Sequence, residues 1–332
     1  MFTPIHTSLG ALLLFQGSTG LLYHNGAILG ISGLVSGSIL RPSRDNVPIV
    51  VGLLSSVIPV YLLAPSFIPN YPNGPHSLAS AAATFGMGIL LGWGTKNGRG
   101  CTSGHMLCGL SRLSPRSIIA TALFFTSAVL TANFGKGFGG SGIPSCGSGP
   151  CYTPIYPSGL ELVFMSGAVA LASLTNHIIV PRFLTRSEES KILFSYIAGL
   201  EFGLGLLISG MADSAKVLGF LAFLTDPYNF DPSLALVIAF GIGPSLVTYL
   251  SKKPGQINDK EKVETKPTLA NQWRIPTATV ADIDWRFVAG AVAFGVAWGL
   301  SGVCPGPALL RTMIQPTWGL PTAGGYIVGN LF

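Results

Sequence analysis

Nine long apolar runs, separated by short polar segments, are the feature that most constrains this chain. A helix that crosses a membrane needs about 20 mainly apolar residues. Hydrophobic residues make up 48% of the 332 residues and charged residues only 10%, whereas a soluble domain carries about 25% charged residues. The pattern predicts an all-α polytopic membrane protein, multi-pass and integral to the cell membrane. Its nine predicted transmembrane helices are 8–23, 47–64, 78–95, 115–134, 157–180, 191–210, 232–250, 285–300 and 317–332.

Four further apolar pieces are too short to cross a bilayer. They lie at about 26–40, 101–111, 213–225 and 304–312, and each follows a glycine-containing break. Unpaired backbone groups in lipid cost several kcal/mol each, so broken helices persist only where protein surrounds them or where they line a wet cavity. We therefore expect four re-entrant half-helices.

Loop charge orients the predicted crossings. The basic residues gather in loops on one face, at Arg41, Arg44, Lys96, Arg99, Arg112, Arg116, Arg182, Arg186, Lys191 and along the polar loop 251–284. Cytoplasmic loops of membrane proteins carry an excess of Lys and Arg. This predicts that the basic face is cytoplasmic and that the N-terminus lies outside. The same bias accounts for the net charge of +6 without a nucleic-acid partner.

The order of the predicted segments repeats along the chain. Residues 1–134 and 191–332 both run crossing, half-helix, crossing, crossing, half-helix, crossing. Between them, 135–190 contains an outer cysteine-containing loop and one connecting helix, which makes the second half enter from the opposite face. Inverted repeats with paired broken helices indicate a transporter with a binding site at the bilayer midplane.

Two cysteines, Cys101 and Cys304, begin equivalent half-helices of the predicted repeat. Helix N-termini offer free N–H groups and a partial positive charge of roughly half a unit, which favours an anion. A thiol is a weak donor with a soft, polarizable sulfur, so a soft sulfur-containing anion fits best. The other predicted contacts with this anion are Ser103, Gly104, His105, Ser301 and Gly302. The alternative is that each buried cysteine packs as a small hydrophobe.

The remaining cysteines have other predicted roles. Cys108 lies seven residues after Cys101, which is two turns of an α-helix, so it either extends the line of thiols or packs. Cys146 and Cys151 lie in a Gly/Pro/Ser-rich loop on the predicted outer face. An oxidising exterior permits disulfides, and we expect a structural disulfide between these two.

Ionisable residues within predicted spans are candidates for proton coupling. Glu201 and His105 are the two that this sequence offers. Glu201 has two further interpretations, an ion pair with Lys216 or a hydrogen bond to a neighbouring helix, and His105 equally fits simple packing.

Four motifs resemble those of the YeeE/YedE sulfur-transport proteins. They span Gly98–Arg112, Ile208–Met211, Asp231–Leu236 and Gly299–Ala308, so the resemblance extends over nearly the whole chain. It implies a thiosulfate transporter of inverted-repeat fold whose buried cysteines pass the anion on through S–H···S contacts.

Carried over by motif, Cys101 and Cys304 are the strongest site candidates and Cys108 is weaker. The expected partners are thiosulfate or a similar anion and the lipid bilayer, with no metal, no cofactor and no specified protein partner. The alternative to a non-enzymatic transporter is a membrane-embedded thiol–disulfide or sulfur-transfer enzyme, although the sequence contains no Cys-x-x-Cys motif.

Overall fold

The computed structural model describes all residues except 72–73, 136–142, 144, 148 and 256–265. Every regular element among the described residues is a helix. The first half contains α1 (Pro4–Asn25), α2 (Ile31–Leu40), α3 (Val47–Ser55), α4 (Val57–Leu63), α5 (Leu78–Asn97), η2 (Thr102–Leu110) and α6 (Pro115–Phe134). The connecting part contains α7 (Gly159–Leu174), η4 (Thr175–Ile179) and α8 (Val180–Phe183). The second half contains α9 (Glu188–Ile208), α10 (Ser214–Leu221), α11 (Ala235–Val237), η8 (Ile238–Ile242), α12 (Gly243–Lys252), α13 (Trp285–Ser301), α14 (Pro305–Ile314) and α15 (Pro316–Leu331).

Length and exposed apolar surface confirm the all-α polytopic membrane fold. Six helical stretches among the described residues are long and apolar enough to cross a membrane, namely 78–110, 115–134, 159–183, 188–208, 232–252 and 285–314. Large apolar side chains such as Leu62, Leu160 and Val163 are about 70% exposed. A soluble protein rarely exposes so many large apolar groups together, whereas a lipid-facing surface requires them.

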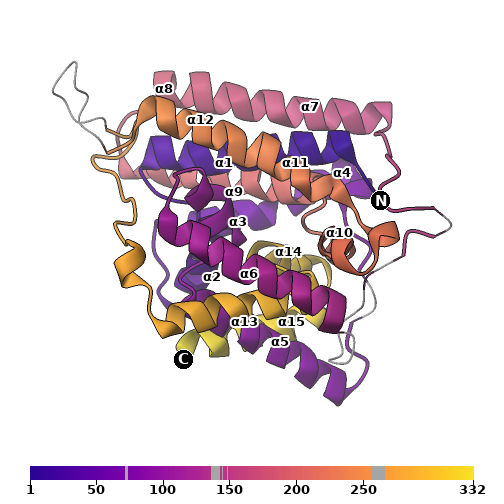
Figure 1. Cartoon of the computed structure of the whole chain (residues 1–332). Coiled ribbons are helices and arrows are strands. Elements are labelled where there is room, and N and C mark those ends of the chain that lie inside the picture. The colour runs from indigo at the N-terminus through magenta and orange to yellow at the C-terminus, as the bar shows by residue number, and fades with distance from the viewer. Residues whose placement is uncertain (72–73, 136–142, 144, 148, 256–265) are drawn as a thin grey trace.

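Seven of the helices form two packed groups, with the short helix α14 between them (Figure 1). One group contains α1, α3 and α9, and the other contains α5, α6, α13 and α15. The short helix α14 contacts α3 and α9 in the first group and α15 in the second, while α10 contacts α6 and α13. The principal helix pairs each join one half of the chain to the other, so the halves 1–134 and 191–332 share one core.

Glycines allow these long helices to approach closely. A Cβ atom on Gly92 of α5 would lie 2.2 Å from the carbonyl oxygen of Tyr326 in α15. In the other group, a Cβ atom on Gly199 of α9 would lie 2.0 Å from the carbonyl oxygen of Ile49 in α3. Small residues at such contacts are typical of helix packing in membranes, where dispersion replaces the hydrophobic effect between helices.

A residue with positive φ stands at each of the four predicted breaks. Gly26, Gly210 and Gly302 have φ of 68°, 77° and 67° after α1, α9 and α13. After α5 the residue is Arg99, with φ of 54°. The left-handed region suits glycine and ends a helix by turning the chain away from it. The short helices that follow have 8 to 10 residues. Even ten residues of α-helix extend only about 15 Å, half of a roughly 30 Å bilayer core.

Part of the polar loop 251–284 is packed against the end of α1. The backbone N–H groups of Thr268, Leu269 and Arg274 donate to the carbonyls of Tyr23, His24 and Gly26 at 3.0, 2.8 and 2.7 Å. The last carbonyls of a helix lack partners within it, and the strap made by residues 266–276 supplies them. Residues 256–265 of the predicted loop lie outside the described residues.

Candidate functional site

The half-helices begin around a small cavity that contains two of the predicted cysteines. This cysteine cavity has a volume of about 60 Å³. Its walls are mainly apolar: Leu14, Ile31, Cys101, Thr102, Ser103, Met106, Leu107, Phe202, Leu206, Met211, Phe220, Leu234, Val237, Ile242, Trp298, Cys304, Gly306 and Pro307. The structure therefore places Cys101 and Cys304, from opposite halves of the chain, at one site.

Three half-helices begin at this cavity. Gly30, Cys101 and Cys304 are the N-cap residues of α2, η2 and α14, and none of the three accepts a hydrogen bond through its side chain. The first N–H groups of a helix have no partner within it. The N–H of Ile31 already donates to Ser103 Oγ, and Pro305 and Pro307 of α14 carry no N–H. The first N–H groups of η2 and the N–H of Gly306 therefore remain to receive an anion. The fourth half-helix differs, because Asp213 caps α10 by accepting from the N–H of Ala215.

Hydroxyl groups link the thiols across the cavity wall. The Thr102 hydroxyl donates to Cys304 Sγ at 3.4 Å, although the two residues come from different halves. Cys101 Sγ lies 3.3 Å from Ser103 Oγ, and Ser103 Oγ accepts from the N–H of Ile31 at 3.0 Å. Cys101 and Cys304 are free thiols with exposed fractions of 1% and 6%. The site is a pocket of weak donors whose two thiols are almost inaccessible to solvent. Its walls contain no cationic side chain.

A much larger cavity lies on the predicted cytoplasmic side of the same helix ends. This basic vestibule has a volume of about 630 Å³. Its charged wall residues are five cations, Lys96, Arg99, Arg112, Arg116 and Arg274, and one carboxylate, Asp45. Asp45 accepts from both terminal nitrogens of Arg274 at 2.7 and 3.1 Å. The vestibule thus has an excess of positive charge, which raises the local concentration of anions.

The vestibule and the cysteine cavity adjoin along the first turns of α2 and η2. Gly30 and Gly104 line the vestibule, while the adjacent residues Ile31 and Ser103 line the cysteine cavity. A Cβ atom on Gly104 would lie 3.8 Å from Cα of Gly30. We call this closest approach the glycine junction. The glycine junction lies where the linings of the two cavities meet, and the predicted site residue Gly104 belongs to it.

His105 lies at the vestibule and not in the cysteine cavity. Its Nε2 is 3.0 Å from the carbonyl oxygen of Gly98, and its Nδ1 is 3.1 Å from Ser117 Oγ. A carbonyl only accepts, so Nε2 carries a proton. In the neutral ring Nδ1 then accepts from the Ser117 hydroxyl. Both nitrogens already have partners within the protein, which holds the ring in place.

Cys108 does not share the cavity of Cys101, contrary to the two-turn spacing of an α-helix. The short helix that holds both residues is a π-helix, whose hydrogen bonds close over five residues instead of four, so each turn takes more residues. Cys108 therefore points elsewhere. Its Sγ lies 3.6 Å from the carbonyl oxygen of Leu29, and it lines a separate small cavity.

Ser301 and Gly302 end α13 and do not line the cysteine cavity. Ser301 Oγ donates to the carbonyl of Ala297 at 2.7 Å and accepts from the N–H of Val303 at 3.2 Å. Gly302 turns the chain with positive φ, and a Cβ atom there would lie 2.4 Å from the carbonyl oxygen of Ser214. Both residues position Cys304 instead of contacting the cavity.

Glu201 faces the connecting helix and lies outside the cysteine cavity. Its two carboxylate oxygens accept from Asn176 Nδ2, each at 3.0 Å. The predicted pairing with Lys216 is wrong, because Lys216 Nζ lies 4.0 Å from Asp231 instead. The structure shows the hydrogen bond to a neighbouring helix, and proton coupling at Glu201 stays a prediction.

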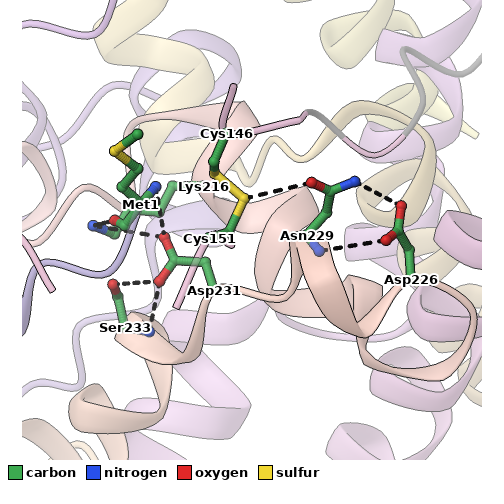
Figure 2. Close-up of a disulfide and its surroundings, with 8 residues drawn as sticks. All are labelled: Met1, Cys146, Cys151, Lys216, Asp226, Asn229, Asp231 and Ser233. Atoms are coloured by element: carbon green, nitrogen blue, oxygen red, sulfur yellow. Dashed lines mark hydrogen bonds and ion pairs between the residues drawn. A yellow bond between two sulfur atoms is a disulfide. The ribbon is translucent and has the colours of Figure 1, made fainter. Parts of the chain in front are cut away.

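The disulfide joins Cys146 to Cys151 and lies among polar contacts (Figure 2). The N–H of Cys151 donates to the carbonyl of Tyr228 at 2.9 Å, and the carbonyl of Cys151 accepts from the N–H of Phe2 at 2.8 Å. Close by, Asp231 pairs with Lys216 and accepts from the Ser233 hydroxyl at 2.5 Å. These contacts tie the outer loop to both halves of the chain.

Sequence patterns did not predict several residues of the site. The apolar walls, such as Phe220 and Trp298, carry no signal that distinguishes them from lipid-facing residues. The vestibule gathers basic residues from loops that are distant in sequence, and positive-inside bias explains their presence equally well. The glycines of the junction were visible, but many of the 43 glycines only serve helix packing.

The chain is similar to proteins that are described as probable transporters. The profile of a family of unknown function, DUF6691, matches residues 190–319. A protein of Xylella fastidiosa strain Temecula1, described as a "Probable transporter", is 42% identical over 132 residues, which are 38% of this chain and 90% of that protein. Two more proteins of this description, from strain 9a5c, are 41% and 36% identical over 133 and 121 residues. These matches cover 38% and 36% of this chain and 90% and 74% of the two relatives.

Proposed function

The chain belongs to the family of these probable transporters, and we propose that it carries thiosulfate, or a related soft sulfur anion, along its buried thiols. The observation that carries this proposal is the meeting of Cys101 and Cys304 at one cavity, at the uncapped ends of η2 and α14. Such ends attract the charge of the anion. The thiols add weak, soft contacts to its terminal sulfur.

Weak contacts suit passage better than tight binding. Conduction requires a site that an anion enters readily and also leaves. The cysteine cavity has no cationic wall residue, so nothing there would hold a dianion firmly. The Thr102 and Ser103 hydroxyls next to the thiols give the anion further donors on its way to the vestibule.

The membrane potential sets the energetic requirement. Moving a dianion inward against 100 mV costs roughly 4.6 kcal/mol, at about 2.3 kcal/mol per charge. Uptake therefore needs proton coupling, rapid consumption or a steep gradient. Of the two proton-coupling candidates, His105 lines the vestibule and Glu201 is buried beside Asn176.

The alternative, a membrane-embedded thiol–disulfide or sulfur-transfer enzyme, is less well supported. Cys101 and Cys304 are nearly inaccessible, and a thiol-exchange partner has to reach the sulfur that it attacks. A small anion needs no such access by a protein partner.

Uptake of labelled thiosulfate into vesicles that contain the purified protein tests the proposal. We expect Cys304→Ala to abolish uptake while the variant unfolds at the wild-type temperature. Wild-type uptake by the folded variant would contradict the thiol pathway. Absence of uptake by the wild-type protein itself would contradict thiosulfate transport.

A further inference from the structure

One buried cation of the vestibule has donors without partners. Arg116, at the start of α6, is only 8% exposed, and its Nε and one terminal nitrogen, Nη2, are buried without a hydrogen bond. Leaving a buried donor unpaired costs about 1–3 kcal/mol, and more for a charged group. A guanidinium has no neutral form in proteins, so Arg116 meets this cost as a cation.

The surroundings of Arg116 hold its guanidinium in place without satisfying these donors. Its Cζ lies 4.8 Å from the ring centre of Phe287, a cation–π contact that attracts the charge but accepts no N–H in the plane of the guanidinium. The Phe287 ring also packs edge-on against His105. Arg116 is therefore held against the Phe287 ring. It lines the vestibule together with Ser114 and Ser117.

The vestibule around Arg116 favours an anion. Of its other cations, Arg274 is paired with Asp45 and Lys96 donates to the carbonyl of Leu331. The nearest ion pair of Arg99, with Asp284, is long at 3.9 Å, and both side chains are about half exposed. A negative ligand between Arg116 and Arg99 would meet two cations, and it would compete there only with Asp282 and Asp284, neither of which hydrogen-bonds Arg116.

We propose that the basic vestibule contains a second anion site, built on Arg116, which binds a small tetrahedral oxyanion such as sulfate through its oxygens. Guanidinium groups match oxyanions by paired N–H···O bonds, whereas a thiol adds little to a hard oxygen. The proposal rests on the proposed function for the identity of the transported anion. The vestibule recognises the oxygen end that thiosulfate shares with sulfate, and the cysteine cavity recognises the sulfur end that sulfate lacks.

Binding of labelled sulfate to the purified full-length protein, at low ionic strength, tests this site. We expect wild-type protein to bind sulfate and Arg116→Gln to bind it at least about tenfold more weakly, which corresponds to the loss of roughly 1.4 kcal/mol. Lys96→Gln, a matched loss of one vestibule charge, should weaken binding much less. Equal losses in the two variants would mean diffuse attraction and would overturn the site, as would wild-type binding by Arg116→Gln or no binding by the wild-type protein.

A second pair of measurements keeps the test independent of folding and of transport. Arg116→Lys retains a buried charge but not the guanidinium fork, so we expect a folded protein that still binds sulfate more weakly than the wild-type protein does. Cys101→Ala should bind sulfate normally, and unlabelled thiosulfate should displace sulfate from it. If the wild-type protein binds sulfate but takes up no thiosulfate, the Arg116 site stands and the proposed function fails.

Discussion

The two ends of the protein are built differently around the same cysteine cavity. On the basic face, a wide vestibule has half-exposed charges and one exposed ion pair, Asp45 with Arg274. On the opposite face, the disulfide lies beside the buried pair of Lys216 with Asp231 (Figure 2). Backbone hydrogen bonds of Cys151 to Phe2 and Tyr228 join the outer loop to both halves. The difference suggests that the disulfide face stabilises the fold, while the basic face collects and passes anions. Each prediction below tests that division.

The glycine junction should give the largest effect on transport. Gly104→Leu places a side chain between the vestibule and the cysteine cavity, so we expect uptake of thiosulfate to be abolished with little change in unfolding temperature. Gly33→Leu is the control, because Gly33 also lines the vestibule but has no atom within 4 Å of an added Cβ. Equal uptake by the two variants would remove the junction from the pathway.

The buried ion pair should dominate stability on the disulfide face. Asp231 lies 3.4 Å from the ammonium of Met1 and 4.0 Å from Lys216 Nζ, so Asp231→Ala leaves the buried Lys216 without this carboxylate. Breaking a buried pair in this way costs about 3–5 kcal/mol. The corresponding change on the basic face, Asp45→Ala, removes an exposed pair worth about 0–1 kcal/mol. Denaturant unfolding in detergent measures both. Similar losses in the free energy of unfolding for the two variants would show that the disulfide face does not stabilise the fold more than the basic face does.

The disulfide should contribute less than the buried pair. Cys146→Ser combined with Cys151→Ser removes a cross-link between residues five apart, and chain entropy gives such a short loop about 2 kcal/mol. We expect a lower unfolding temperature with thiosulfate uptake retained. Loss of uptake in a folded double variant would instead place the outer loop in the transport pathway.

The smallest predicted effect is a pH dependence of the strap on the basic face. The hydrogen bond from Arg274 lowers the pKa of Asp45, so the pair stabilises the strap above the unfolded pKa of about 3.9 and is lost as pH falls through the lower folded value. Trp273 packs against Tyr23 and reports the strap by fluorescence. We expect Trp273 fluorescence to change as the pH falls in the wild-type protein but not in Arg274→Gln. The same change in Arg274→Gln would exclude the Asp45–Arg274 pair as its cause.

The sequence predicted the helical segments well because their signals are local. All nine predicted crossings are helical, but only six stretches of the described residues are long and apolar enough to cross a membrane, and 8–23, 47–64 and 317–332 are not among them. The glycine breaks identified the ends at Gly26, Gly210 and Gly302, where the backbone has positive φ. The meeting of Cys101 and Cys304 depended on the repeat, which supplied a correspondence between distant segments. The orientation of the two halves in the membrane stays a prediction.

The remaining site depended on geometry that local patterns do not encode. The α-helical spacing predicted that Cys108 shares a helix face with Cys101, but η2 is a π-helix, so the two thiols point to different cavities. The partner of Glu201 is Asn176, 25 residues away on another helix, and no periodicity selects it from the other polar residues. The unpaired donors of Arg116 become visible only once its neighbours are placed.

The central claim is that the thiols of the cysteine cavity, and not buried thiols in general, carry the anion. Thiosulfate uptake by Cys101→Ala and Cys108→Ala, measured side by side, tests it most directly, since Cys101 caps η2, Cys108 lies within it, and both are buried. We predict that Cys101→Ala abolishes uptake while Cys108→Ala retains most of it. Equal uptake by the two folded variants would contradict the proposed pathway.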